Sequence, residues 1–272
     1  MHLSGVHFFF LLLSFTLLSP VLSANAQESK SIAQLSKELA EKYKDRQPIL
    51  WGEHLSGVTD IVDPSEAAPD NSPPPARVLA LTLDACAGGT DERIIALLRE
   101  YHVPVTIFVT NRWLNHNKTV ADNLAKDPLF LMACHGKRHK PASVNGKQVY
   151  GIDGTSNIPA LVEEVEENVR AVTALTGVRP TWFRSGTAYY DDVAVEVIRD
   201  LGLSIAGYTV TGDKGASLPP NEVAQNLLNA PNRAIILCHM NRPESGTFEG
   251  LALAIPELLR QGTLFVTLGK TR

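Results

Sequence analysis

From Val78 onward, short apolar runs rich in β-branched residues alternate with longer stretches whose apolar positions recur every three or four residues. The first pattern is typical of buried strands and the second of amphipathic helices. The predicted strands are 78–83, 105–110, 129–134, 181–184, 204–208, 234–238 and 264–268. The predicted helices are 92–100, 119–125, 158–176, 191–201, 221–229 and 248–260. This alternation predicts successive βα units on a mainly parallel sheet.

Repeated βα units of this kind predict an α/β protein with a closed or nearly closed barrel. An open, doubly wound sheet is the competing topology, because the pattern does not give the order of the strands. The chain has no GxGxxG after the first strand and no GxxxxGK[ST]. Dinucleotide-binding and P-loop functions therefore lose their main support.

The N-terminal residues have the pattern of an export signal. An apolar run from Val6 to Leu22 ends in the small-residue sequence Ala24-Asn25-Ala26. This run is short for a membrane span and precedes a typical cleavage site, so we expect residues 1–26 to be a signal peptide. The mature chain is then secreted or periplasmic, without an integral membrane span. An uncleaved anchor is the alternative, because His2 and the amino terminus are the only positive groups before the run.

Residues 27–75 are expected to form an extension before the main domain. Apolar positions within 31–44 have helical spacing, and the turn-rich stretch that follows closes with Asn71-Ser-Pro-Pro-Pro. Consecutive prolines cannot continue a helix, so residues 47–75 are predicted to be an extended connector. The barrel domain is predicted to span residues 76–272.

Charge and cysteine content narrow the function further. The net charge is −4, and there are three cysteines. An acidic chain without a basic stripe is a poor partner for nucleic acid or an anionic membrane. At most one internal disulfide can form, and burial as small apolar residues is the simpler role for the cysteines. The sequence does not indicate an oligomeric state.

Polar residues follow several predicted strands where parallel strands end, which is the edge where α/β proteins carry their chemistry. The candidates in chain order are Asp84, His135, His139, Arg184, Asp213 and His239. Four-residue spacing places the first two histidines on one side of a turn, as a divalent metal requires. The alternatives are surface or capping histidines, a capping Asp84, a core His239, and a structural ion pair for Arg184 or Asp213.

These residues and their neighbours resemble the motifs of one family. Asp84 lies in Thr-Leu-Asp-Ala-Cys, His135 and His139 in HxxxHxP, and Arg184 in Phe-Arg-Ser-Gly-Thr-Ala-Tyr-Tyr, with Asp213 and then His239 in Leu-Cys-His. In that order they are similar to the motifs of polysaccharide deacetylases, also called the NodB-homology domain or carbohydrate esterase family 4. The resemblance covers residues 78–268.

The resemblance implies a distorted (β/α)7 barrel, a bound divalent metal, usually zinc, and hydrolysis of N-acetyl groups on an N-acetylated glycan. The resemblance implies that His135 and His139 are metal ligands. It makes Asp84 the general base, oriented by Arg184, and His239 the general acid, oriented by Asp213.

The chain departs from the family pattern at Ala85, where a second aspartate usually binds the metal. Two histidines make a weak site, because a catalytic zinc usually has three protein ligands and a water. The third ligand could be Asp84 itself, Asp91, or, least favoured, a thiolate from Cys86. A degraded site is a fourth possibility.

Three functions follow from these motifs. We favour an exported, metal-dependent deacetylase, because Asp84, Arg184 and His239 are not needed for binding alone. The first alternative is a non-catalytic protein that binds a glycan and keeps the barrel, which Ala85 would allow. The second is a hydrolase of another non-peptide C–N bond, such as a formamide or a ring amide.

Overall fold

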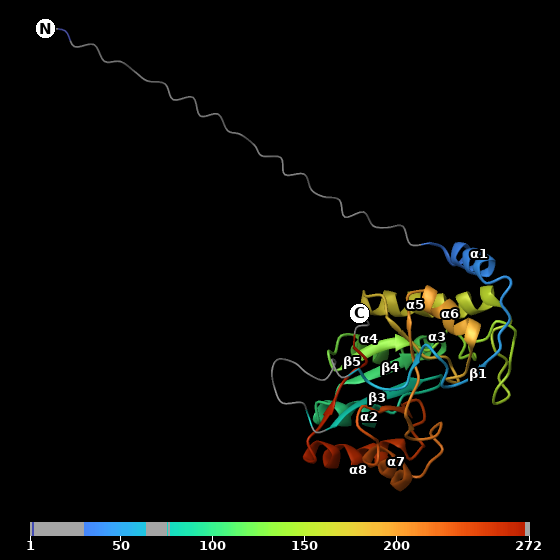
Figure 1. Ribbon diagram of the computed structural model, residues 1–272. Helices are drawn as coiled ribbons and strands as arrows, with labels where there is room; N and C mark the ends of the chain where they lie inside the picture. The colour runs from blue at the N-terminus through green and yellow to red at the C-terminus, as the bar shows by residue number, and fades with distance from the viewer. Residues whose placement is uncertain (1, 3–29, 64–74, 76, 270–272) are drawn as a thin grey trace. The chain divides into compact units, whose positions relative to one another are not determined.

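The computed structural model describes residue 2, residues 30–63, residue 75 and residues 77–269 (Figure 1). The predicted signal peptide and the proline-rich end of the predicted connector lie outside the described residues, apart from His2 and Pro75. The described residues from Ser31 onward form one compact unit, so residues 31–63 of the predicted extension belong to the same unit as the barrel. No helix among the described residues is long and apolar enough to cross a membrane.

The centre of this unit is a curled parallel sheet in the order β2-β8-β6-β5-β4-β3-β10-β9, with β11 also paired to β3. Each pairing in this sheet is parallel. Its strands are β2 (Val58–Thr59), β3 (Arg77–Ala85), β4 (Val105–Val109), β5 (Phe130–Cys134), β6 (Trp182–Phe183), β8 (Ser204–Ala206), β9 (Val210–Thr211), β10 (Ile235–His239) and β11 (Thr263–Phe265). The sheet confirms the barrel-like α/β fold expected from the sequence.

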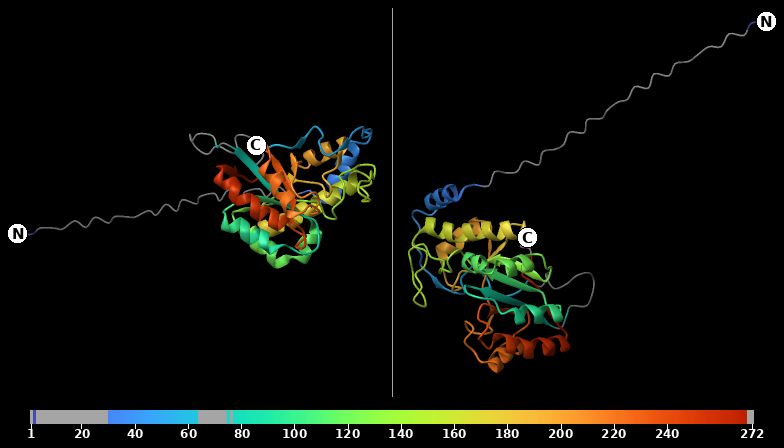
Figure 2. Two further views of the ribbon diagram at one scale, coloured as in Figure 1. Left: turned by 90° about the horizontal axis from the view of Figure 1, so that it is seen from below. Right: turned by 180° about the vertical axis from the view of Figure 1, so that it is seen from behind.

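Helices connect most of the strands and cover the outside of the curled sheet (Figure 2). They are α1 (Ile32–Lys42), α2 (Glu92–Glu100), α3 (Asn111–His116), α4 (Lys118–Ala125), α5 (Ile158–Thr176), α6 (Asp192–Asp200), α7 (Pro220–Leu228) and α8 (Thr247–Arg260). The longest of them, α5, begins where the Asn157 side chain accepts a hydrogen bond from the Ala160 N–H and ends at Gly177, which has a φ of 75°. Both are standard end signals, and the predicted range of this helix matches the observed one.

Strand β3 shows how the sheet divides the interior into two clusters. Its residues Leu79, Leu81 and Leu83 belong to the large core that also contains helical side chains. Val78 and Ala80 belong to a smaller cluster with residues from other strands. Because side chains alternate along a strand, the positions that continue the second row are Thr82 and Asp84. The side chains of β3 that face the inside of the barrel therefore begin with apolar residues and end with the Asp84 carboxylate.

The N-terminal segment contributes to the sheet instead of forming only a connector. Helix α1 packs on α5, as Figure 1 shows. Strand β1 (Trp51–Gly52) pairs antiparallel with β7 (Tyr190–Asp191), and β2 pairs with β8. Beyond β2, the Val62 N–H donates to the Arg233 carbonyl at 2.9 Å. Residues 58–62 of the predicted connector thus lie between β8 and the start of β10.

Candidate active site

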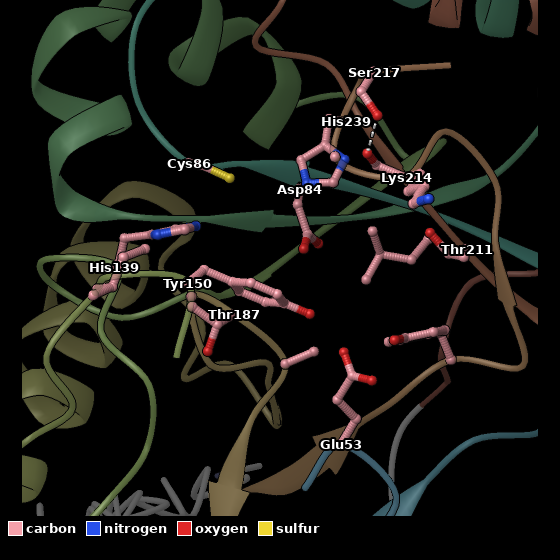
Figure 3. A pocket seen from close by; sticks show the side chains of 16 residues that line it. Glu53, Asp84, Cys86, His139, Tyr150, Thr187, Thr211, Lys214, Ser217 and His239 are labelled. Atoms are coloured by element: carbon pink, nitrogen blue, oxygen red, sulfur yellow. Dashed lines mark hydrogen bonds between the residues drawn. The ribbon is translucent and has the colours of Figure 1, made fainter. Parts of the chain in front are cut away.

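A cavity of about 430 Å³ opens where β3 and β10 end (Figure 3). Its lining combines residues from the strand ends, from loops and from the N-terminal segment. Those that carry polar or ionisable groups include Glu53, Asp84, Cys86, His139, Tyr150, Thr187, Tyr208, Thr211, Lys214, Ser217 and His239. Asp84 and His239 are direct partners in the register of β3 and β10, so the sheet itself places them side by side.

Asp84 is held as a carboxylate by a buried arginine. Arg184 Nη1 donates to Asp84 Oδ1 at 2.8 Å, and both side chains are almost fully buried. Burial raises the pKa of the Asp84 carboxyl, but the charge and hydrogen bond of Arg184, together with the nearby His135 and His239, outweigh burial and hold this pKa below its usual value. Arg184 also donates to the carbonyl of Gly207 at 2.7 Å, so its guanidinium has a fixed position. Asp84 is therefore ready to accept a proton.

Asp213 favours the protonated form of His239, just as Arg184 favours the ionised form of Asp84. The Nδ1 of His239 lies 2.9 Å from Asp213 Oδ1, and its backbone N–H donates to Asp213 Oδ2 at 2.6 Å. Burial lowers the pKa of the His239 imidazole, but the hydrogen bonds and negative charges of Asp213 and Cys86 together outweigh burial and raise this pKa well above its usual value. Because Nδ1 is engaged, Nε2 is the nitrogen left to donate a proton.

His135 and His139 follow β5, and their rings meet edge to face with centroids 4.9 Å apart. His135 Nδ1 lies 2.9 Å from the Arg184 carbonyl, which leaves Nε2 as the nitrogen with a free lone pair. This arrangement is the usual one for a metal-binding histidine. His139 has a φ of 66°, a conformation that non-glycine residues rarely adopt and that often marks a functional position.

Two buried polar residues on α5 hold the loop between these histidines, and sequence reasoning did not identify them. Asn168 Oδ1 accepts from the N–H groups of His135 at 2.8 Å and Gly136 at 2.9 Å. Glu164 Oε1 accepts from the Arg138 N–H at 2.7 Å. Both lie on the buried face of α5, four residues apart. Polar residues on the apolar face of an amphipathic helix are the signal that could have found them.

Cys86 completes a cluster with the two histidines. The ligand atoms of Cys86, His135 and His139 all lie within 4.8 Å of one another, and they form the one such cluster found in the described part of the chain. One sulfur and two imidazole nitrogens are a donor set that zinc accepts. The residues present therefore fit the divalent metal that the sequence motifs imply. Asp84 is not part of the cluster, although its Oδ2 lies 3.5 Å from His135 Nε2.

The environment of Cys86 differs from that of the other two cysteines. Cys134 and Cys238 are fully buried, whereas Cys86 is half-buried and lines the cavity, and all three are free thiols. Burial opposes ionisation of Cys86, but hydrogen bonds from the surrounding histidines outweigh it and lower the pKa of this thiol well below its usual value. Burial raises the pKa of the other two thiols. Among these cysteines, Cys86 alone has its pKa shifted in the direction that favours the thiolate.

The N-terminal segment adds Glu53 to the cavity wall, a position that no sequence pattern indicated. Glu53 follows β1, and its carboxylate points into the cavity opposite Asp84 (Figure 3). Burial and hydrogen bonding to Glu53 both raise the pKa of the Tyr208 hydroxyl. Tyr150 lines the same cavity from the loop before α5.

The six residues expected from the sequence lie close together. Asp84, His139 and His239 line the cavity, and each of them contacts one of the other three, Arg184, His135 and Asp213. Asp84 contacts Arg184 and His135, and His239 contacts Asp213. Asp91, one of the possible third ligands, has another role. It caps α2 and pairs with Arg93 at 2.7 Å, so it does not join the metal-binding cluster.

The chain is similar in sequence to one protein family and to one curated protein. The sequence profile of the family described as polysaccharide deacetylase matches residues 71–206. The chain is 22% identical over 169 residues to an uncharacterized protein, YlxY, from Bacillus subtilis strain 168, covering 61% of this chain and 49% of that protein. The chain thus spans about half the length of this curated relative.

Two solved structures have the same fold. BA3943 from Bacillus anthracis, a pseudoenzyme of carbohydrate esterase family 4, superposes with a TM-score of 0.62 at 21% identity, covering 86% of this chain and 79% of that one. PdaA from Bacillus subtilis, a family 4 carbohydrate esterase, gives a TM-score of 0.60 at 17% identity, covering 85% and 86%. A mutant of BA3943 is described as having restored enzymatic activity. The profile match spans half of the sequence and agrees with the fold, so the chain belongs to the polysaccharide deacetylase family.

Proposed function

We propose that the protein is an exported, metal-dependent hydrolase that removes N-acetyl groups from an amino-sugar polymer or oligosaccharide. One observation carries this proposal: two ion pairs end at the same cavity, Asp84 with Arg184 and His239 with Asp213, and they prepare a proton acceptor beside a proton donor. Binding a glycan would not require opposite protonation states on adjacent strands, whereas amide hydrolysis does.

The residues divide the chemistry between them. The Asp84 carboxylate accepts a proton from the attacking water, and the water oxygen forms a bond to the amide carbon. The C–N bond then breaks as Nε2 of His239 gives its proton to the leaving amine. Arg184 keeps Asp84 oriented, and Asp213 keeps the donor nitrogen directed at the cavity.

His135 and His139 would hold a divalent cation beside these groups. Such a cation would polarise the amide carbonyl and lower the pKa of a bound water toward about 7. The proximity of Asp84 Oδ2 to His135 Nε2, at 3.5 Å, puts the proposed base next to the proposed metal. Family membership supports the substrate class, and one similar structure, the T48 deacetylase, is described with its substrate.

Acetate release from chito-oligosaccharides, peptidoglycan and poly-N-acetylglucosamine tests the proposal, with zinc, cobalt or manganese present. We expect His239→Ala and Asp84→Asn to lower the rate by about 10²–10⁴-fold, the usual contribution of a general acid or base. His116→Ala, at an exposed position of α3, is the matched control and should leave the rate unchanged. Equal rates in all variants would refute the catalytic assignment.

A non-catalytic glycan-binding function is the second candidate, and Ala85 favours it because the usual carboxylate ligand is missing. One similar protein is described as a pseudoenzyme. Glycan binding that survives chelation and Asp84→Ala, without acetate release from any substrate, would identify this function. Release of another product from a formamide or ring amide would instead identify a different C–N bond.

Export is supported by the apolar run that ends at Ala24-Asn25-Ala26. We expect the mature protein to begin after Ala26 and to be found in the periplasm or the medium. Determination of the N-terminal sequence of the purified protein checks the cleavage site, and an intact leader in the membrane fraction would favour the anchor.

A further inference from the structure

At the position where the family pattern has a carboxylate ligand, this chain has an alanine that is part of the hydrophobic core. Ala85 is fully buried and belongs to the same apolar cluster as Leu83 and Val109. A methyl group there supplies packing and no ligand atom. If His135 and His139 bind a metal in this chain, their partner must come from another position.

Cys86 lies one residue further along, just after β3 ends, and its sulfur faces the histidines. Cys86 Sγ is 3.7 Å from His135 Nε2. Zinc binds sulfur at about 2.3 Å and imidazole nitrogen at about 2.0–2.1 Å, so the S···N edge of a tetrahedral site is about 3.6 Å. The two atoms therefore stand at the separation that a shared zinc ion would set. Figure 3 shows the sulfur on the same side of the cavity as His139.

The other acidic candidates are engaged elsewhere. Asp91 pairs with Arg93 and caps α2. Asp84 Oδ1 accepts from Arg184, and the carboxylate does not share the three-residue cluster, although it lies close to His135. Among the described residues, Cys86 is thus the group whose geometry completes the site.

We propose that a Cys86 thiolate replaces the missing aspartate and forms, with His135 and His139, a three-ligand zinc site that leaves Asp84 free to act as a base. This inference concerns the metal site of the proposed function and rests on it for its chemical meaning. A thiolate favours zinc over magnesium or manganese, which prefer oxygen ligands. Binding displaces the thiol proton to solvent.

The first test is metal content and spectroscopy of the purified full-length protein. We expect about one zinc ion per chain in the wild type and in Cys134→Ala, which removes a buried cysteine outside the cluster. Cys86→Ala should lose at least about tenfold in zinc affinity. The cobalt-substituted wild type and Cys134→Ala should show a near-ultraviolet thiolate-to-cobalt charge-transfer band. Cys86→Asp should bind cobalt without this band.

The second test needs no variant. Iodoacetamide labelling of the wild type, mapped by mass spectrometry, should modify Cys86 quickly in the metal-free protein and slowly in the zinc-loaded protein. The buried Cys134 and Cys238 serve as internal references. Equal labelling rates of Cys86 in both forms, or a charge-transfer band that persists in Cys86→Ala, would overturn the inference.

The outcomes separate this inference from the proposed function. A wild type that binds zinc and shows the charge-transfer band when cobalt replaces zinc, but releases no acetate, would retain the thiolate site and refute deacetylation. Full acetate release by Cys86→Ala with unchanged metal content would retain deacetylation and refute the thiolate site.

Discussion

Asn168 on α5 is expected to control both stability and metal binding, although it lies outside the cavity. Its Oδ1 accepts from the His135 and Gly136 N–H groups, and its Nδ2 donates to the Val109 carbonyl at 3.0 Å and to Asn111 Oδ1 at 2.7 Å. The change Asn168→Leu keeps the approximate volume and removes all four hydrogen bonds. The loop that carries His135 then loses its attachment to the helix.

The size of the effect follows from the groups left without partners. The His135 N–H keeps a second acceptor, the Val109 carbonyl at 3.1 Å, so its loss is small. The buried Gly136 N–H loses its partner at a cost of about 1–3 kcal/mol, and the half-buried Asn111 side chain loses less. We expect the free energy of unfolding to fall by about 2–4 kcal/mol, a large part of the about 5–15 kcal/mol typical of a domain.

Urea unfolding followed by circular dichroism measures this change, and metal content measures its effect on the site. Loss of a group that orients a ligand typically lowers metal affinity by about 10–100-fold. Ala174→Leu introduces the same residue at an exposed position of α5 and is the matched control. If Asn168→Leu unfolds at the same urea concentration as this control and keeps its metal, the assignment of Asn168 as the support of the loop is wrong.

Three further predictions concern the site. The proposed function needs His239 in its protonated form, and Asp213 raises the pKa of this imidazole. Activity should therefore be lost as pH rises through that pKa, and Asp213→Asn should move this alkaline limb of the kcat/KM profile to lower pH. An unmoved limb would contradict the assignment. Gly186→Ala would place a Cβ 2.3 Å from the His139 carbonyl carbon, so we expect a lower metal content and a free energy of unfolding reduced by about 1–3 kcal/mol. Gly89→Ala adds a Cβ in open space and should change neither quantity. Chelation should lower the thermal midpoint, because a metal at 100 times its Kd stabilises the folded state by about 2.7 kcal/mol; an unchanged midpoint would argue against a bound metal.

The sequence predicted the long elements well because their signals are local. The bounds of α2 and α5 agree with the predicted ranges, since Asp91, Asn157 and Gly177 mark their ends. The strands β1, β2, β7 and β9 were missed. Each has only two residues, and its pairing depends on distant parts of the chain. Short strands of this kind carry no periodicity that a pattern can detect.

The residues of the candidate site were predicted from where strands end, and the same reasoning explains what was missed. Asp84 and His239 continue the alternation of their strands, so their direction could be inferred. Cys86 lies beyond the end of β3, where alternation no longer fixes the direction of a side chain. Glu53 reaches the cavity through the pairing of β1 with β7, which the sequence does not encode locally.

The pairing of β2 with β8 has a consequence for the order in which this domain can assemble. The segment that is synthesised early, and that supplies Glu53, must wait for a partner strand that begins at Ser204. Contacts between such distant parts of a chain close large loops and slow folding. A nascent chain that has reached only the end of the family-matching region already contains His135 and His139 but lacks His239, the proposed proton donor. The proposed catalytic pair of Asp84 and His239 can therefore form only after synthesis has passed residue 239.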